Sequence, residues 1–169
     1  VAFRNIAKLV TDGEDVPDCV EWVPGGYPTN YDPAPDPGAM LDWGDDIQPM
    51  LDACLNSRDR ALVALAWDLG PRPGELFDLT PGSITSHQYG LQVTVDGKNG
   101  RRSPVLVPSV PYVRRWLDDH PGDDDDALWS LLTKATPDGI SNNRVRDILK
   151  EVADRAGVDK SVTPTVFRK

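Results

Sequence analysis

One segment, residues 59–69, constrains the fold of this chain more than any other. Its sequence, DRALVALAWDL, is apolar nearly all round when it is wound into an α-helix. A helix of that kind is stable only when other elements bury it on several sides. The Gly70-Pro71 pair that follows ends the helix. The sequence therefore predicts a domain assembled around this buried helix.

Periodicity elsewhere predicts a mainly α-helical domain with one small antiparallel β-hairpin. Residues 90–95 alternate apolar and polar side chains as a half-buried strand does, and residues 103–108 supply a second strand. The turn that joins them, residues 96–102, is basic at its tip. Further helices are predicted over 43–51, from Pro73, over 112–119, from a cap at Ser141 to Gly157, and from Pro164 onward.

Composition divides the chain into three parts. Residues 13–38 are rich in Pro, Gly and Asp, and repeated prolines block helices and strand pairing, so we expect an extended linker there. Residues 1–12 are interpreted as the end of a preceding domain, and residues 39–169 as the main globular domain. We expect the chain to lie within a longer protein, because it starts without Met and ends abruptly.

The composition excludes several classes of protein. No apolar run approaches the roughly 18 residues that span a bilayer, and the N-terminus lacks the pattern of a signal peptide. Cys19 and Cys54 form neither a metal-spaced pair nor a disulfide framework. We therefore expect a cytoplasmic protein with reduced thiols and without a metal.

The net charge of −9 argues against a nucleic-acid partner, and on charge alone an acidic protein with scattered surface arginines is favoured. Two features oppose that interpretation. The acidic residues are nearly all aspartate, a bias suited to concentrated salt, where charges are screened beyond about 3 Å at 1 M. The charge is also uneven, with acid before Arg60 and at residues 123–126, and with basic groups at residues 98–102, at residues 114–115 and from Arg144 onward.

Three positions are candidates for chemistry, each with an ordinary structural alternative. Arg72 occupies a tight turn between two helices, where it can pair with Glu75 or present a rigid guanidinium to a phosphate. Lys98 lies at the hairpin tip, where a lysine is most often a solvated charge. Arg168 follows the sequence TPTVF, and one arginine in a helix means little alone.

Taken in order, the three positions resemble the tyrosine recombinase, or phage integrase, family. The sequence GPRPGEL of residues 70–76 is similar to the family motif that carries the first catalytic arginine. The sequence GKNGRR of residues 97–102 is similar to the hairpin that carries the catalytic lysine, and TVFRK of residues 165–169 to the motif of the second arginine. The resemblance covers residues 40–169, and the salt-adapted composition suggests a Xer-like recombinase of a halophilic archaeon.

This resemblance implies the fold of the family's catalytic domain and its reaction. In that reaction DNA strands are cleaved and rejoined through a 3′-phosphotyrosyl intermediate, without a metal or cofactor. The resemblance implies that Arg72 and Arg168 stabilise charge on the phosphate and that Lys98 is a general acid. It also implies that residues 1–12 end a SAM-like core-binding domain.

The sequence departs from the family pattern at two positions. Thr165 stands where the family has a histidine, and Lys169 stands where a further histidine is usual. Threonine donates a hydrogen bond but cannot act as a base near neutral pH. The family's nucleophilic tyrosine follows the second arginine, and no tyrosine follows Arg168 here, so we expect this chain to stop before the nucleophile and to be inactive alone.

Double-stranded DNA is the expected partner, with other recombinase subunits assembled on it, and neither a membrane nor a small-molecule substrate is expected. Two alternatives stay open: a degenerate relative that binds DNA without cleaving it, and a helical interaction domain with no role on DNA. The residues expected to bind DNA are Lys98, Arg101, Arg102, Arg144, Arg146 and Lys169.

Overall fold

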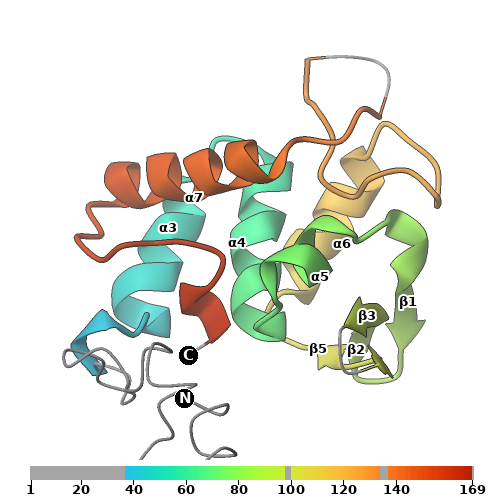
Figure 1. Ribbon diagram of the computed structural model, residues 1–169, viewed down its shortest axis with the longest axis horizontal. Helices are drawn as coiled ribbons and strands as arrows, with labels where there is room; N and C mark the ends of the chain where they lie inside the picture. Colours follow the sequence, from blue (N-terminus) through green and yellow to red (C-terminus); the bar gives the residue numbers. More distant parts are fainter. Residues whose placement is uncertain (1–36, 98–99, 134–136, 169) are drawn as a thin grey trace, which may run out of the picture. The chain divides into compact units, whose positions relative to one another are not determined.

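The computed structural model describes residues 37–97, 100–133 and 137–168. The chain separates into two units, residues 1–35 and 36–169, and the described residues all belong to the second. This second unit is mainly helical, as the sequence predicts, and carries two small antiparallel sheets where one hairpin was predicted (Figure 1). No helix among the described residues has the length and apolar character needed to cross a membrane.

Helix α4 (Ser57–Leu69) forms the centre of the unit. Its residues from Ala61 to Ala66 are at most 1 % exposed, in agreement with a pattern that is apolar all round. The side chain of Asn56 accepts the Asp59 N–H at 2.8 Å and so caps the first turn. Three helices pack around α4: α3 (Gln48–Ala53), α6 (Val110–Asp119) and α7 (Asn142–Ala156) (Figure 1).

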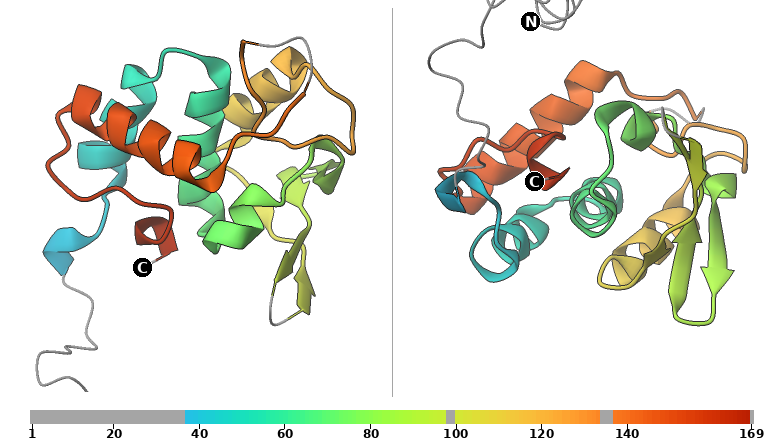
Figure 2. Two further views of the ribbon diagram at one scale, coloured as in Figure 1. Left: turned by 45° about the horizontal axis from the view of Figure 1, so that its top comes forward. Right: turned by 60° about the horizontal axis from the view of Figure 1, so that its bottom comes forward.

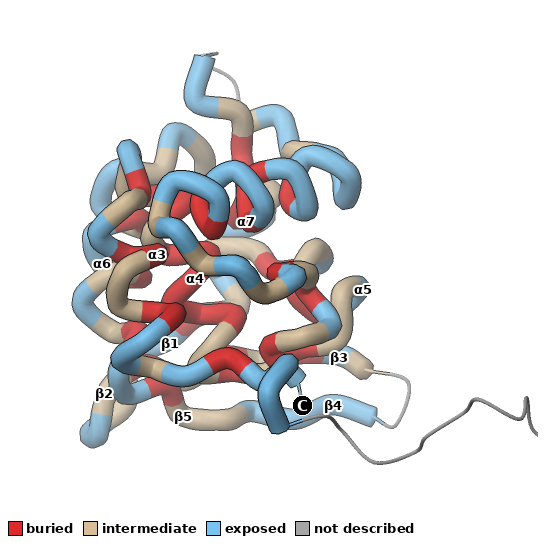
Figure 3. The backbone as a smooth tube through the Cα atoms, turned by 90° about the vertical axis from the view of Figure 1, so that its left-hand side faces the viewer, coloured by how far each residue is buried: buried red, intermediate tan, exposed pale blue. Residues whose placement is uncertain are grey.

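Helix α7 has the boundaries that its caps predict. Ser141 accepts the Arg144 N–H at 3.2 Å, and Gly157 closes the helix in the left-handed conformation with a φ of 73°. The helix buries one face and exposes the other (Figure 3). The buried residues are Val145, Ile148, Leu149, Val152 and Ala153.

A buried ion pair at the start of α4 was not predicted from the sequence. Arg58 Nε and Nη2 donate to Asp59 Oδ1 at 2.9 and 2.7 Å, and Nη1 donates to the Ser130 carbonyl at 2.9 Å. Both charged residues are almost fully buried. Because each charge has a partner, the pair ties the segment around Ser130 to α4 without leaving an isolated buried charge.

The predicted hairpin is divided into two sheets. Strands β1 (Ile84–His87), β2 (Gly90–Val93) and β5 (Val105–Leu106) form an antiparallel sheet in the order β1-β2-β5. Strands β3 (Val95–Gly97) and β4 (Gly100–Arg102) form the second pair.

The division occurs where the β2–β5 pairing gives way to other backbone bonds. The Thr94 N–H donates to the Ser83 carbonyl at 2.8 Å, while the Val93 N–H donates to the Pro104 carbonyl at 3.0 Å. Strand β2 lies between β1 and β5, whereas β3 pairs with β4, so the strands predicted over 90–95 and 103–108 are each interrupted. The β3–β4 pair projects from the rest of the unit (Figure 2).

The helix expected from Pro164 onward is not found. The described residues there form only a 3₁₀ turn, η4 (Val166–Arg168). The remaining helical segments are short. They are η1 (Pro37–Ala39), η2 (Trp43–Ile47), α5 (Pro73–Phe77) and η3 (Pro81–Ser83).

The loop before η4 is held to the opposite end of the described chain. Lys160 Nζ donates to Asp46 Oδ2 at 2.5 Å and to the Met40 carbonyl at 2.9 Å. Asp46 is buried and also accepts the Asp42 N–H at 2.7 Å. The lysine therefore links the segment that leads into the helices with the segment that leads to Arg168.

Candidate functional site

Arg72 is positioned by the sharp turn between α4 and α5. Gly70 ends α4 with a φ of 53°, a left-handed conformation that costs other residues about 1 kcal/mol. Pro73 then begins α5 at a position where its missing N–H is not needed. Between them, the Arg72 N–H donates to Glu75 Oε2 at 2.9 Å and Arg72 Nη1 donates to Glu75 Oε1 at 3.0 Å. The guanidinium is thus fixed while its side chain stays 39 % exposed.

Glu75 holds a second guanidinium as well. Arg102 Nη2, on β4, donates to Glu75 Oε2 at 2.9 Å, and the Glu75 side chain is only 4 % exposed. Burial acts to raise the pKa of Glu75, but the bonds from the Arg72 N–H and from the Arg102 and Arg72 side chains outweigh burial and lower this pKa to about 2. The carboxylate therefore stays charged at neutral pH and joins the Arg72 turn to the β3–β4 pair.

The absence of a side chain at Gly97 allows this junction to form. A Cβ at that position would lie 2.5 Å from Glu75 Oε1 and 3.6 Å from Arg72 Nη1. The end of β3 therefore lies directly against the Glu75–Arg72 pair, at a distance that only glycine permits.

Arg168 lies beside the same turn although it is far from Arg72 in the sequence. A Cβ on Gly70 would be 3.5 Å from the Phe167 carbonyl oxygen and 4.0 Å from the Arg168 Cα. Phe167 is buried in the core and anchors η4 there. Within the part of the chain that the structure describes, no carboxylate forms an ion pair with the exposed Arg168 side chain.

These groups line one cavity of about 460 Å³, which we call the arginine cavity. It combines four guanidinium side chains from three separate segments with a single carboxylate. Its lining consists of Gly70, Arg72, Glu75, Gly100, Arg101, Arg102 and Arg168.

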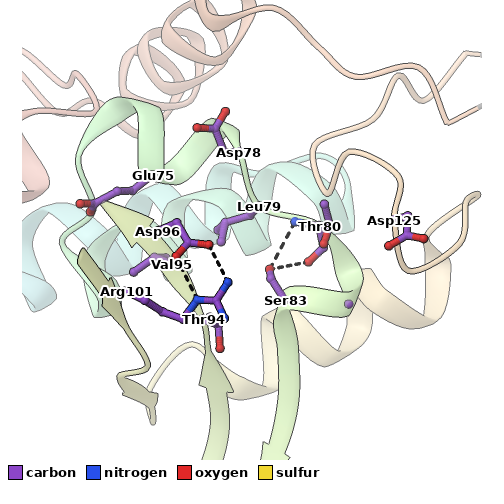
Figure 4. A pocket seen from close by; sticks show the side chains of 11 residues that line it. Glu75, Asp78, Leu79, Thr80, Ser83, Thr94, Val95, Asp96, Arg101 and Asp125 are labelled. Carbon is purple, nitrogen blue, oxygen red and sulfur yellow. Dashed lines mark hydrogen bonds and ion pairs between the residues drawn. The ribbon is translucent and has the colours of Figure 1, made fainter. Parts of the chain in front are cut away.

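A second cavity, of about 470 Å³, shares Glu75 and Arg101 with the arginine cavity. Here Arg101 binds Asp96 through two bonds, Nε to Oδ1 at 2.9 Å and Nη2 to Oδ2 at 3.1 Å (Figure 4). Asp78 and Asp125 make this cavity acidic. Of the two cavities, the arginine cavity is therefore the one suited to an anion.

The structure brings together only part of the residue set expected from the sequence. Arg72, Arg101, Arg102 and Arg168 line the arginine cavity, whereas Lys98 and Lys169 lie outside the described residues. Thr165 is exposed and does not belong to the lining.

The two arginines of α7 lie elsewhere. Arg144 binds Glu151 at 2.7 Å and lines a cavity with Leu55 and Arg155, and Arg146 lines another cavity with Lys150. Their contact with DNA stays a prediction.

The arginine cavity has the groups needed to bind a phosphate and to stabilise its negative charge. Guanidinium groups bind phosphate oxygens in a fixed planar geometry, and groups fixed in advance stabilise charge that develops during a reaction. Among the described residues, no group of three or more His, Cys, Asp or Glu side chains could hold a metal ion. The positive charge in the described lining of the cavity is carried by its four arginine side chains.

Comparison with known proteins relates the chain to one group of enzymes. No protein-family model matches it. The tyrosine recombinase XerC of Alcanivorax borkumensis is 31 % identical over 134 residues, which cover 73 % of this chain and 43 % of that protein. The chain thus spans less than half the length of this relative.

Solved structures agree on the fold. XerA recombinase matches with a TM-score of 0.64 and 21 % identity, over 76 % of this chain and 47 % of that one. XerH site-specific recombinase, in a pre-cleavage complex with its difH substrate, matches with a TM-score of 0.59 and 14 % identity, over 78 % of this chain and 41 % of that one. The mainly helical fold with small antiparallel sheets is therefore that of site-specific recombinases, as predicted.

Proposed function

We propose that this chain supplies most of the phosphate-binding site of a tyrosine recombinase, which cleaves and rejoins double-stranded DNA at a specific site. One observation carries the proposal: Arg72 and Arg168, from distant segments, line the same cavity. The similarity to XerC supports the same assignment.

In the proposed reaction a tyrosine oxygen attacks the phosphorus, and the bond to the 5′-oxygen breaks. The products are a 3′-phosphotyrosyl link and a 5′-hydroxyl. Arg72 and Arg168 would stabilise the charge that builds on the non-bridging oxygens. Lys98, outside the described residues, is the proposed donor of the proton that the 5′-oxygen takes up. The link conserves the energy of the phosphodiester, so rejoining needs no other energy source.

The tyrosine is not among the residues that follow Arg168 in this sequence. We therefore propose that the nucleophile lies in a part of the protein outside these 169 residues, and that the 169 residues alone cleave no DNA. Assembly of several subunits on DNA, a cytoplasmic location and adaptation to concentrated salt complete the proposal. The excess of acidic over basic residues, 27 against 18, supports the last of these.

The test is covalent capture with a nicked DNA substrate that prevents rejoining. The complete protein should form a protein–DNA band that survives denaturing electrophoresis, and the 169-residue chain should form none. The substitutions Arg72→Ala and Arg168→Ala should each slow formation of the band by about 10²–10³-fold. Thr165→Ala should slow it at most modestly, because Thr165 does not line the arginine cavity. A band formed by the 169 residues alone would show that the nucleophile is wrongly assigned.

A second candidate, a degenerate relative that binds DNA without cleaving it, is favoured by one observation. Thr165, in the place of the family's histidine, is exposed and outside the cavity lining. If the complete wild-type protein were inert on its native site while Thr165→His gained activity, this second function would be the correct one.

A further inference from the structure

We infer that Arg102 is a third phosphate-binding residue, which contacts the same phosphodiester as Arg72 and Arg168. This inference rests on the proposed function and deepens it, because it adds a ligand to the proposed substrate site. The resemblance to the family assigns catalytic arginines only at positions 72 and 168.

The first argument is that Arg102 keeps N–H donors that its bond to Glu75 does not use. An arginine carries five N–H donors in a planar fork. Glu75 receives one guanidinium nitrogen from each arginine, Nη1 of Arg72 and Nη2 of Arg102. The Arg102 side chain forms no other hydrogen bond among the described residues, so its Nε and Nη1 remain available, and it is 42 % exposed. Glu75 thus orients Arg102 in the same way as it orients Arg72.

The second argument is charge. Asp96 neutralises Arg101 and Glu75 neutralises one further guanidinium, which leaves two positive charges among the four arginines of the cavity. A phosphodiester carries one negative charge, and more charge builds on its oxygens as the nucleophile attacks. A surplus of two positive charges therefore favours the transition state over the ground state.

The third argument is what the cavity lacks. Thr165, the position expected to help bind the phosphate, is exposed and does not line the cavity. Arg101 is engaged by two bonds to Asp96. Arg102 is the remaining oriented donor in the described lining, and it can take over this contact.

The first experiment uses the 169-residue chain and sulfate, a tetrahedral anion, as the probe. The arginine Nε–H signals are followed by NMR during a sulfate titration, with each signal assigned by substitution. Signals of Arg72, Arg102 and Arg168 should shift along one binding curve. The matched control is Arg115, an exposed arginine on α6 that pairs with Asp119 and whose signal should not move on that curve.

Substitution separates contact with the anion from support of Glu75. Arg102→Gln keeps a donor for Glu75 but loses the charge and the fork, and it should weaken sulfate binding at least fivefold while the signal of Arg72 still shifts. If Arg72 and Arg168 shift and Arg102 does not, and Arg102→Gln binds sulfate like wild type, the inference is overturned while the proposed function stands. If none of the three shifts, both are overturned.

A second experiment examines the reaction in the complete protein. The scissile phosphate is replaced by methylphosphonate, which removes one non-bridging oxygen and its charge. If Arg102 contacts that oxygen, the cleavage defect of Arg102→Gln should shrink at least tenfold on one of the two methylphosphonate isomers. A defect that is equal on all three substrates would mean a purely structural role. Failure of wild type to cleave the phosphodiester would instead contradict the proposed function.

Discussion

Gly97 and Glu75 are in closer contact than any other residue at position 97 would permit, because a Cβ there would lie 2.5 Å from Glu75 Oε1. The contact joins the end of β3 to the carboxylate that orients Arg72 and Arg102. A single missing methyl group therefore sets the spacing between the hairpin and the Arg72 turn.

The first prediction follows from this contact. Gly97→Ala should force the Glu75 carboxylate to move and should destabilise the fold by about 1–3 kcal/mol, as overpacking generally does. Gly74→Ala is the matched control, since a Cβ there meets nothing within 4 Å and alanine favours the helix. Urea unfolding of the two variants measures the difference, and equal stabilities would contradict the predicted clash.

The second prediction concerns acid stability. The pKa of Glu75 is lowered from 4.5 to about 2 in the fold, so its charged form contributes stability above pH 4.5 that is lost as the pH falls toward 2. The difference corresponds to about 3 kcal/mol. Glu75→Gln should therefore be less stable than wild type near neutral pH, and the gap should close on acidification. A gap that stays constant from pH 6 to pH 2 would exclude this role for Glu75.

The third prediction concerns DNA binding by the 169-residue chain. Each phosphate contact contributes about 0.9 to the slope of log affinity against log salt. Arg72→Ala and Arg168→Ala should each reduce the slope by about that amount, because both side chains line the arginine cavity. Arg115→Ala should leave the slope unchanged, since it lies on α6 and pairs with Asp119. Fluorescence anisotropy with duplex DNA over a salt series gives the slopes.

The fourth prediction concerns the Lys160–Asp46 link. Lys160→Met removes a charged partner from a buried carboxylate and should cost about 2 kcal/mol of stability. The double variant Lys160→Met, Asp46→Asn should recover part of that loss, because no unpaired charge remains. Additive losses in a double-mutant cycle would mean that the two side chains act independently.

The helices that the sequence predicts best are those with strong local signals. Helix α4 follows from its apolar sequence and from Gly70, and α7 follows from Ser141 and Gly157 as caps. The strand β1 was not predicted, because Ile84–His87 has neither a clear alternation nor β-branched residues at each position. It forms a tight hairpin with β2, in which His87 pairs with Gly90, and the strands predicted as one hairpin are found in two sheets.

The residues of the candidate site could also be predicted only where a local sequence pattern marks them. The order of motifs singles out Arg72 and Arg168, and the spacing of Arg72 and Glu75 suggests their ion pair. The bond between Glu75 and Arg102 depends instead on the close approach of Gly97, which no local pattern reveals. The helix expected from Pro164 is reduced to the turn η4, in which Phe167 is buried in the core.

Several anchors meet at the last turn of α4. Asp68 Oδ2 accepts the N–H groups of Val107 and Ser109 at 2.8 and 3.1 Å, and the Ser109 hydroxyl at 2.8 Å. Gly70 lies against the turn that carries Arg168, and the chain then continues directly into Arg72. The three segments that carry the arginines are thus attached to this turn by separate contacts: the bonds to Asp68, the packing on Gly70 and the direct chain connection to Arg72. A substitution in one of these segments therefore leaves the attachments of the other two in place.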